Sequence, residues 1–141
     1  MKNSRSLDDL TPKVRAMAIE FVKRCAAEGI DVIVTSTLRD YEAQDALFAQ
    51  GRTKPGDIVT NARGGFSYHN FGVAFDFCPI KGGKCQWKNE ALFRRCGEIG
   101  EEIGLEWAGR WFGRMREMAH LQDAEVNLEE LRAARALKGS P

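Results

Sequence analysis

The sequence predicts a small single domain of the α+β class. Apolar residues recur at three- and four-residue spacing in some segments, which indicates helices, and alternate with other residues elsewhere, which indicates strands. The 141 residues contain no repeats and no low-complexity tracts, and this length suits one domain with a real core. We expect residues 1–125 to form the domain. Residues 126–141 are expected to form a C-terminal helix that is either part of it or a short tail.

Capping residues mark the two helices expected in the first fifty residues. Thr11 followed by Pro12 is typical of a helix start, because Thr11 can accept from free amides and Pro12 lacks an N–H that would need a partner. Asp40 is a second cap, and its helix is expected to bury its aromatic and leucine side chains. The predicted elements are a helix from Pro12 to Gly29, a strand over 31–35, and a helix from Asp40 to Gln50 that buries Tyr41, Leu47 and Phe48.

Residues 51–68 form a long polar segment without periodicity, and long loops inside small domains are often functional. The last helix has leucines on one side and a basic side, which we interpret as a solvated face in preference to a membrane or envelope contact. Those residues are Leu128, Leu131 and Leu137, and Arg132, Arg135 and Lys138. The further elements expected are a strand over 73–77, a helix from Asn89 to Gly104, a short strand over 119–122, and a last helix opened by a capping box at 127–130.

Composition and charge exclude several classes of protein. Twenty-one basic and 20 acidic residues give a net charge of +1, whereas binding nucleic acid through its phosphates needs a basic excess or stripe. No segment approaches the ~18 to 20 consecutive apolar residues that cross a bilayer. The N-terminus lacks the apolar core of a secretory signal. We therefore expect no nucleic-acid partner and no membrane span, and a protein made in the cytoplasm that stays there unless it is released.

The four cysteines lack the CxxC spacing of a zinc knot or redox motif. Cys25 and Cys96 fall on apolar helix faces, where buried free thiols are expected. Cys78 and Cys85 flank a glycine turn and could meet across a hairpin. A disulfide there is the less favoured alternative in a chain without an export signal.

The chain contains only two histidines, and each lies near a carboxylate: His69 precedes Asp76, and His120 follows Glu117. A catalytic zinc takes three protein ligands from nitrogen and oxygen donors and keeps a fourth position open. Alternation along the strand at 73–77 turns the large apolar side chains toward the core and Asp76 toward a cleft. A turn over residues 70–72 can bring His69 back to Asp76. Taken singly, either histidine would more simply be an unrelated surface or core residue.

The complete pattern around these histidines resembles a family. The string S-x-H-x-x-G-x-A-x-D, followed some tens of residues later by [DE]-x-x-H, resembles the zinc peptidases related to D-alanyl-D-alanine carboxypeptidases and dipeptidases. The pattern is complete here at Ser67, His69, Gly72, Ala74 and Asp76, and again at Glu117 and His120. The resemblance implies a central antiparallel sheet flanked by helices, with the zinc site on the sheet, as in the D-Ala-D-Ala peptidase and hedgehog-like fold.

The resemblance also implies the roles of single residues. Zn²⁺ would be held by His69, Asp76 and His120. Glu117 would be the general base and Arg39 would stabilise the oxyanion or orient the substrate carbonyl.

Two further residues are expected in substrate binding. Ser67 binds a substrate carboxylate or orients a ligand. Gln44 either stands behind such groups or is an amide on the helix surface, and the sequence leaves both readings open. Trp107 and Trp111 are as readily core residues as a wall of the substrate site.

Three segments look closest to the L-alanyl-D-glutamate endopeptidases, which include phage endolysins and bacterial wall-lytic enzymes. They are residues 35–44, 50–62 and 107–111. We therefore expect a monomeric hydrolase that cuts the L-Ala–D-Glu bond of peptidoglycan stem peptides, released from the cell by a holin if it is a phage protein. The alternatives are a D-Ala-D-Ala carboxypeptidase or dipeptidase, and a non-catalytic wall-binding module that retains zinc. Departures from the usual pattern leave the scissile bond open: Glu117 where many relatives have Asp, Arg110 at an often acidic position, and Ala108 at a frequent glycine.

Overall fold

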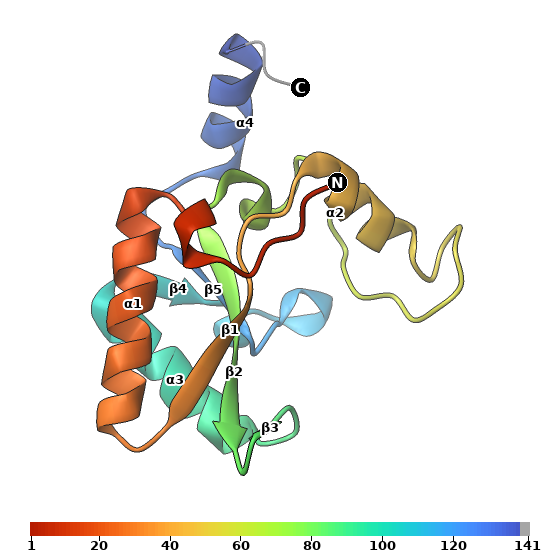
Figure 1. Ribbon diagram of the computed structural model, residues 1–141. Coiled ribbons are helices and arrows are strands. Elements are labelled where there is room, and N and C mark those ends of the chain that lie inside the picture. Colours follow the sequence, from red (N-terminus) through yellow and green to blue (C-terminus); the bar gives the residue numbers. More distant parts are fainter. Residues whose placement is uncertain (139–141) are drawn as a thin grey trace.

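An antiparallel sheet forms the centre of the protein, and helices pack against it (Figure 1). The computed structural model describes residues 1–138, and within them the sheet has five strands in the order β1-β2-β5-β4, with β3 paired to β2. The α+β class and the central antiparallel sheet are therefore confirmed. The helices are α1 (Pro12–Ala27), α2 (Tyr41–Ala49), α3 (Glu90–Ile103) and α4 (Leu128–Leu137), and the strands are β1 (Asp31–Ser36), β2 (Ala74–Lys81), β3 (Lys84–Cys85), β4 (Leu105–Trp107) and β5 (His120–Asp123).

All four predicted helix caps are confirmed. Thr11 begins α1, Asp40 begins α2, Asn89 begins α3 and Asn127 begins α4, and each side chain accepts from a backbone N–H three residues later. These bonds satisfy amides that have no partner within the helix. The helix starts are therefore fixed by the local sequence.

The core lies on one face of the sheet, between the sheet and helices α1 and α3. Phe75 and Phe77 point toward it from β2, as the strand alternation predicted, and both are fully buried. The Phe21 ring of α1 lies 5.7 Å from the Phe75 ring and 5.0 Å from the Phe77 ring. Trp107 is buried in the same core, which settles its role. The opposite face of β2 and β5 remains available for a site.

The expected burial along α2 is wrong. Tyr41, Leu47 and Phe48 are only partly buried, and the buried residues of this helix are Ala43 and Gln44. The helix lies at the edge of the domain and turns its polar Gln44 inward because the amide finds hydrogen-bond partners there, which offset the cost of burial.

The structure also shows the burial of the cysteines and whether they form a disulfide. Cys25 and Cys96 are fully buried, as expected. Cys78 and Cys85 are free thiols, so the alternative of a hairpin disulfide is not realised.

The expected last helix is present, and its leucines differ in exposure. Leu137 is 90% exposed, so the leucines do not form one buried side. Arg132 and Lys138 are exposed, as the solvated face predicts, and the guanidinium groups of Arg132 and Arg135 also lie over the rings of Phe66 and Tyr41. The part of the expected segment beyond residue 138 lies outside the described residues. Over residues 1–138, none of the helices combines the length and the apolar character that a membrane span requires.

Candidate metal centre

Three neighbouring strands place polar side chains in one row on the face of the sheet opposite the core. Asp76 of β2 lies directly opposite His120 of β5, and Ser36 at the end of β1 is its partner on the other side. The neighbouring pair, Phe75 and Leu121, points into the core. The alternation of strand side chains therefore separates the site from the core within a single residue step.

His69 reaches this row through a turn. It lies in the 3₁₀ helix η2 (Tyr68–Phe71), which Ser67 caps and which ends at Gly72 with φ of +69°, a conformation that favours glycine. The turn returns the chain to β2 and brings His69 Nε2 to 3.1 Å from Asp76 Oδ1. The predicted reversal at residues 70–72 is therefore present.

The donor atoms of three residues converge. His120 Nδ1 lies 3.3 Å from Asp76 Oδ1, and donor atoms of His69, Asp76 and His120 all lie within 4.8 Å of one another. His120 Nδ1 is buried and has no hydrogen-bond partner among the described residues. In a tetrahedral zinc site the ligand atoms lie about 2.0–2.2 Å from the metal. The ligand atoms of such a site are therefore separated from one another by distances similar to those found here. Two imidazoles and one carboxylate around an unsatisfied buried nitrogen fit a divalent metal such as zinc.

Hydrogen bonds behind the two imidazoles select the nitrogens that face the site. His69 Nδ1 lies 2.8 Å from the Thr37 carbonyl oxygen, which can only accept, so Nδ1 carries the hydrogen and Nε2 is left to bind. His120 Nε2 lies 2.8 Å from Gln122 Oε1, which leaves Nδ1 to bind. Such partners fix the orientation and tautomer of metal-binding histidines.

The charges of the three groups reinforce one another. Burial disfavours the Asp76 carboxylate, but the adjacent His69 and His120 outweigh it and hold the pKa of Asp76 well below its usual range. Burial also disfavours protonated His120, yet the adjacent Asp76 carboxylate raises the His120 pKa. Asp76 is thus an anion at any physiological pH, as a carboxylate ligand must be.

Arg39 points into the same site. Its guanidinium donates from Nη1 to Gln44 Oε1 at 2.9 Å and from Nη2 to Ser36 Oγ at 3.0 Å, and Nη2 lies 4.0 Å from Asp76 Oδ2. Burial lowers its pKa, and the charges of Asp76 and Glu117 oppose that shift, so the group keeps its charge. This arrangement presents a fixed cation beside the three donors.

Gln44 has a different position from the one expected of a substrate-binding residue. It is fully buried behind Arg39, and its Nε2 donates to the Ala62 carbonyl oxygen at 2.8 Å. Of its two predicted readings, support of a group in the site is the one that the geometry favours. Ser67 lines the cleft, and its Oγ accepts from the His69 backbone N–H at 3.2 Å, so it orders the turn that carries this ligand candidate.

Glu117 stands at the open side of the three donors. Its Oε2 lies 3.6 Å from His120 Nδ1, and its side chain is half exposed. The Trp111 ring lies 5.7 Å from the His120 ring and forms part of the wall, unlike Trp107. Arg110, one of the departures from the family pattern, forms an ion pair with Glu101 away from the cleft.

A cleft of about 830 Å³ surrounds these groups. The second half of the long polar segment forms one side of it, and the segment before His120 forms another. The residues from these two segments are Val59, Thr60, Asn61, Ala62, Phe66 and Ser67, and Trp111, Arg114, Met115, Glu117, Met118 and Ala119. A cleft of this size accommodates a short peptide.

Sequence reasoning missed three supporting residues. Gln122 lies two residues after His120 on β5, so the two side chains point to the same face of the sheet. The alternation of side chains along β5 could therefore have identified Gln122. Asn70 is buried, and its amide joins the Arg39 carbonyl oxygen to the Gly65 N–H. Thr37 contributes only a backbone carbonyl, for which no side-chain signal exists.

Comparison with known proteins places this site in a family. Residues 8–130 match the family described as VanY, D-alanyl-D-alanine carboxypeptidase. The chain belongs to this family. The VanY family match covers both histidine motifs and every strand of the sheet. The peptidoglycan L-alanyl-D-glutamate endopeptidase CwlK of Bacillus subtilis (strain 168) is 42% identical over 123 residues, which span 81% of this chain and 73% of that relative.

Solved structures of other peptidases share the fold of this VanY family member. The L-Ala D-Glu endopeptidase ChiX of Serratia marcescens superposes with a TM-score of 0.65 at 16% identity, over 92% of this chain and 91% of that chain. A mutant of the vancomycin resistance D,D-pentapeptidase VanY, in complex with Zn(II), gives a TM-score of 0.63 at 16% identity, over 99% and 86% of the two chains. The expected D-Ala-D-Ala peptidase fold is therefore confirmed.

Replacement of Gln122 by Leu is expected to weaken zinc binding about 10- to 100-fold, the usual effect of losing the partner of a metal-binding histidine. His120 Nε2 would lose its acceptor, and Nδ1 would no longer be held toward the site. Competition with a chromophoric chelator measures the affinity. Gln86→Leu, in the β2–β3 hairpin, is the matched control. Equal affinities in the two variants would show that Gln122 does not orient His120.

Proposed function

We propose that this protein is a zinc-dependent peptidoglycan hydrolase that cuts the L-Ala–D-Glu bond of the stem peptide. The observation that carries the proposal is the convergence of His69 Nε2, Asp76 Oδ1 and His120 Nδ1 beside a carboxylate and an arginine in an open cleft. The choice of bond is supported by CwlK, whose name gives this specificity, at 42% identity. All of these groups belong to one chain, which supports action as a monomer on stem peptides of the wall.

The residues that would hold Zn²⁺ are His69, Asp76 and His120. A zinc ion bound there would act as a Lewis acid and lower the pKa of a water at the open position. The single carboxylate and two neutral imidazoles leave a net positive centre, which suits attack on a carbonyl. The hydrogen bonds that the imidazoles donate to the Thr37 carbonyl oxygen and to Gln122 Oε1 would hold the rings ready for the ion.

Glu117 would serve as the general base. It is three residues before His120, and its carboxylate is 3.6 Å from the donor nitrogen, yet half exposed and free to reach a water in the cleft. From there it can take a proton from the attacking water and return it to the leaving amine. Arg39 would stabilise negative charge on the carbonyl oxygen, since Gln44 and Ser36 fix its guanidinium in place before substrate arrives.

A second candidate is a D-Ala-D-Ala carboxypeptidase or dipeptidase, which the description of the matching family favours. Both candidates place a D-amino acid on the amine side of the bond, so the metal-binding and proton-transfer groups suit either. A non-catalytic wall-binding module has less support, because a purely structural metal site has no use for a base at the position of Glu117.

Digestion of purified peptidoglycan separates these candidates. Mass analysis of the fragments is expected to show new N-terminal D-glutamate, which marks cleavage of the L-Ala–D-Glu bond. Released D-alanine in its place would establish the carboxypeptidase or dipeptidase. An unchanged digest from zinc-loaded protein would indicate the wall-binding module.

Replacement of Glu117 by Gln is expected to give a folded, zinc-loaded protein with activity reduced about a hundred- to ten-thousand-fold, the usual worth of general-base help. Glutamine keeps the size of glutamate but accepts no proton at neutral pH. Release of amino groups from peptidoglycan, zinc content and melting temperature are measured together, with Glu90→Gln as a control far from the cleft. Activity within a few-fold of wild type would exclude Glu117 as the base. Loss of zinc would make Glu117 a ligand instead.

Replacement of Arg39 by Ala is expected to lower turnover about 10²- to 10³-fold, as for the loss of one donor to an oxyanion, while zinc content stays unchanged. The charge acts on the transition state, so kcat falls more than KM rises. Steady-state kinetics on a stem peptide test this, with Arg94→Ala on α3 as the control. A wild-type kcat in Arg39→Ala would show that Arg39 has no catalytic role.

A further inference from the structure

The C-terminal helix α4 packs on the rim of the substrate cleft, although it lies mostly beyond the matching part of the family. The family match ends at residue 130, and α4 continues to Leu137. Leu128, at the start of α4, lines the cleft together with Phe66. The far end of the helix projects from the domain (Figure 1), and Leu137 there is 90% exposed. The described contacts of α4 therefore lie before its far end, at Leu128, Leu131, Arg132 and Arg135.

The segment between β5 and α4 directs the helix to this rim. Asp123 ends β5 and is almost completely buried. Its Oδ1 accepts from the Glu125 N–H at 3.0 Å and from Lys13 Nζ at 3.1 Å, so the turn is tied to α1. Leu131 then packs against the core. These contacts give α4 a defined starting point and direction.

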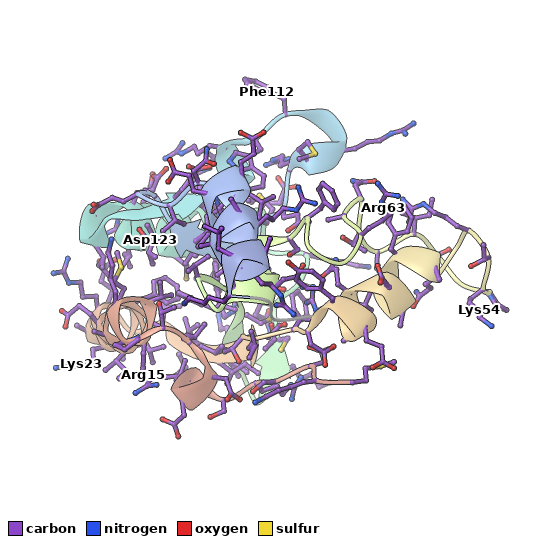
Figure 2. The ribbon with its side chains drawn as sticks, turned by 90° about the horizontal axis from the view of Figure 1, so that it is seen from above. Arg15, Lys23, Lys54, Arg63, Phe112 and Asp123 are labelled. Carbon is purple, nitrogen blue, oxygen red and sulfur yellow. The ribbon has the colours of Figure 1, made fainter. Side chains whose placement is uncertain are left out.

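Two arginines of α4 hold the loop that leads into η2. The Arg132 guanidinium lies 4.0 Å from the centre of the Phe66 ring, and that of Arg135 lies 3.9 Å from the centre of the Tyr41 ring. Tyr41 in turn packs on the backbone of Gly65, where an added Cβ would come within 3.1 Å of the tyrosine ring. Viewed from above, α4 lies beside the loop that carries Arg63 (Figure 2). Consecutive loop residues are thus fixed, one directly and one through α2.

This loop is connected to residues of the candidate metal centre by hydrogen bonds and through the chain. Gly65 N–H donates to Asn70 Oδ1 at 2.9 Å, and the Asn70 amide donates to the Arg39 carbonyl oxygen. Ser67 directly follows Phe66 in the chain, and His69 lies three residues after Phe66. Phe66 itself is 43% exposed and lines the cleft, so its ring forms an apolar surface within reach of a bound peptide.

We propose that α4 forms one wall of the substrate cleft, with Phe66 and Leu128 as its apolar surface and Arg132 as the positioning residue that holds Phe66 in place. The aliphatic portion of the stem peptide is the part of the substrate that this surface suits, which rests on the function proposed above. In this proposal the arginine on the basic side of α4 contacts the Phe66 ring, and the ring contacts the substrate. The arginine does not itself bind an anionic group of the substrate. Arg63 lies 5.5 Å from the same ring and contributes less than Arg132.

Steady-state kinetics on a purified stem peptide containing the L-Ala–D-Glu bond test this wall. Arg132→Gln is expected to raise KM about two- to five-fold, the size of an exposed cation–π contact, while kcat and zinc content keep their wild-type values and the melting temperature falls by only a few degrees. Arg132→Lys, which can still place a cation over the ring, should restore most of the affinity. Phe66→Leu should raise KM similarly, and the double variant should be no worse than either single one. Arg94→Gln on α3 is the matched control.

Hydrogen exchange provides a measurement that does not depend on activity. The amides of residues 61–67 are expected to exchange faster in Arg132→Gln than in wild type, whereas Arg94→Gln leaves them unchanged. Unchanged exchange, or a KM equal to that of Arg94→Gln, would overturn the proposal, as would additive effects of Phe66→Leu and Arg132→Gln. A wild-type protein that leaves the stem peptide intact would refute the proposed function instead, and the exchange experiment would still decide whether α4 positions the loop.

Discussion

The antiparallel pairing of β2 with β5 is the constraint on which the candidate site depends. It sets Asp76 directly opposite His120 on one face and Phe75 opposite Leu121 on the other. Because strand side chains alternate, a shift of one residue would bury the polar pair and expose the apolar one. The core that α1 and α3 form on Phe75 therefore fixes the positions of two metal-ligand candidates. The same β2–β5 register therefore determines both the packing of the core and the geometry of the candidate site.

The end of β1 and the segment after it provide the contacts that orient His69 and Arg39, which the β2–β5 pairing does not position. Thr37 orients His69 through a backbone carbonyl, Ser36 and Gln44 hold the Arg39 guanidinium, and the Arg39 backbone N–H donates to the His69 carbonyl oxygen. One short stretch of chain thus positions an imidazole and a cation relative to each other. Such supports restrict rotation before substrate arrives, and this preorganisation is what makes fixed charges effective.

Local signals in the sequence predicted much of this structure, and long-range contacts account for what they missed. Caps such as Thr11 and Asp40 act on amides three residues away, so the helix starts could be predicted. The two histidine motifs indicated the ligand candidates because their complete pattern resembles a zinc peptidase family, whereas either histidine alone did not. The burial of Gln44 and the contacts of Arg132 depend on partners remote in the sequence, and no periodicity reveals them.

The division between sheet and loops explains how one set of reacting groups can serve different bonds. The L-Ala–D-Glu and D-Ala–D-Ala bonds both present a D-residue as the leaving amine, so a base at Glu117 and a cation at Arg39 would act on either in the same way. The two substrates differ beyond that residue, because the peptide ends after D-alanine and continues after D-glutamate in the middle of a stem peptide. The walls of the cleft would contact the part of the substrate that differs, and these walls come from residues 59–67, from residues 111–119 and from Leu128. We therefore infer that these walls select the bond, because the pairing of β2 with β5 holds Asp76 and His120 independently of them.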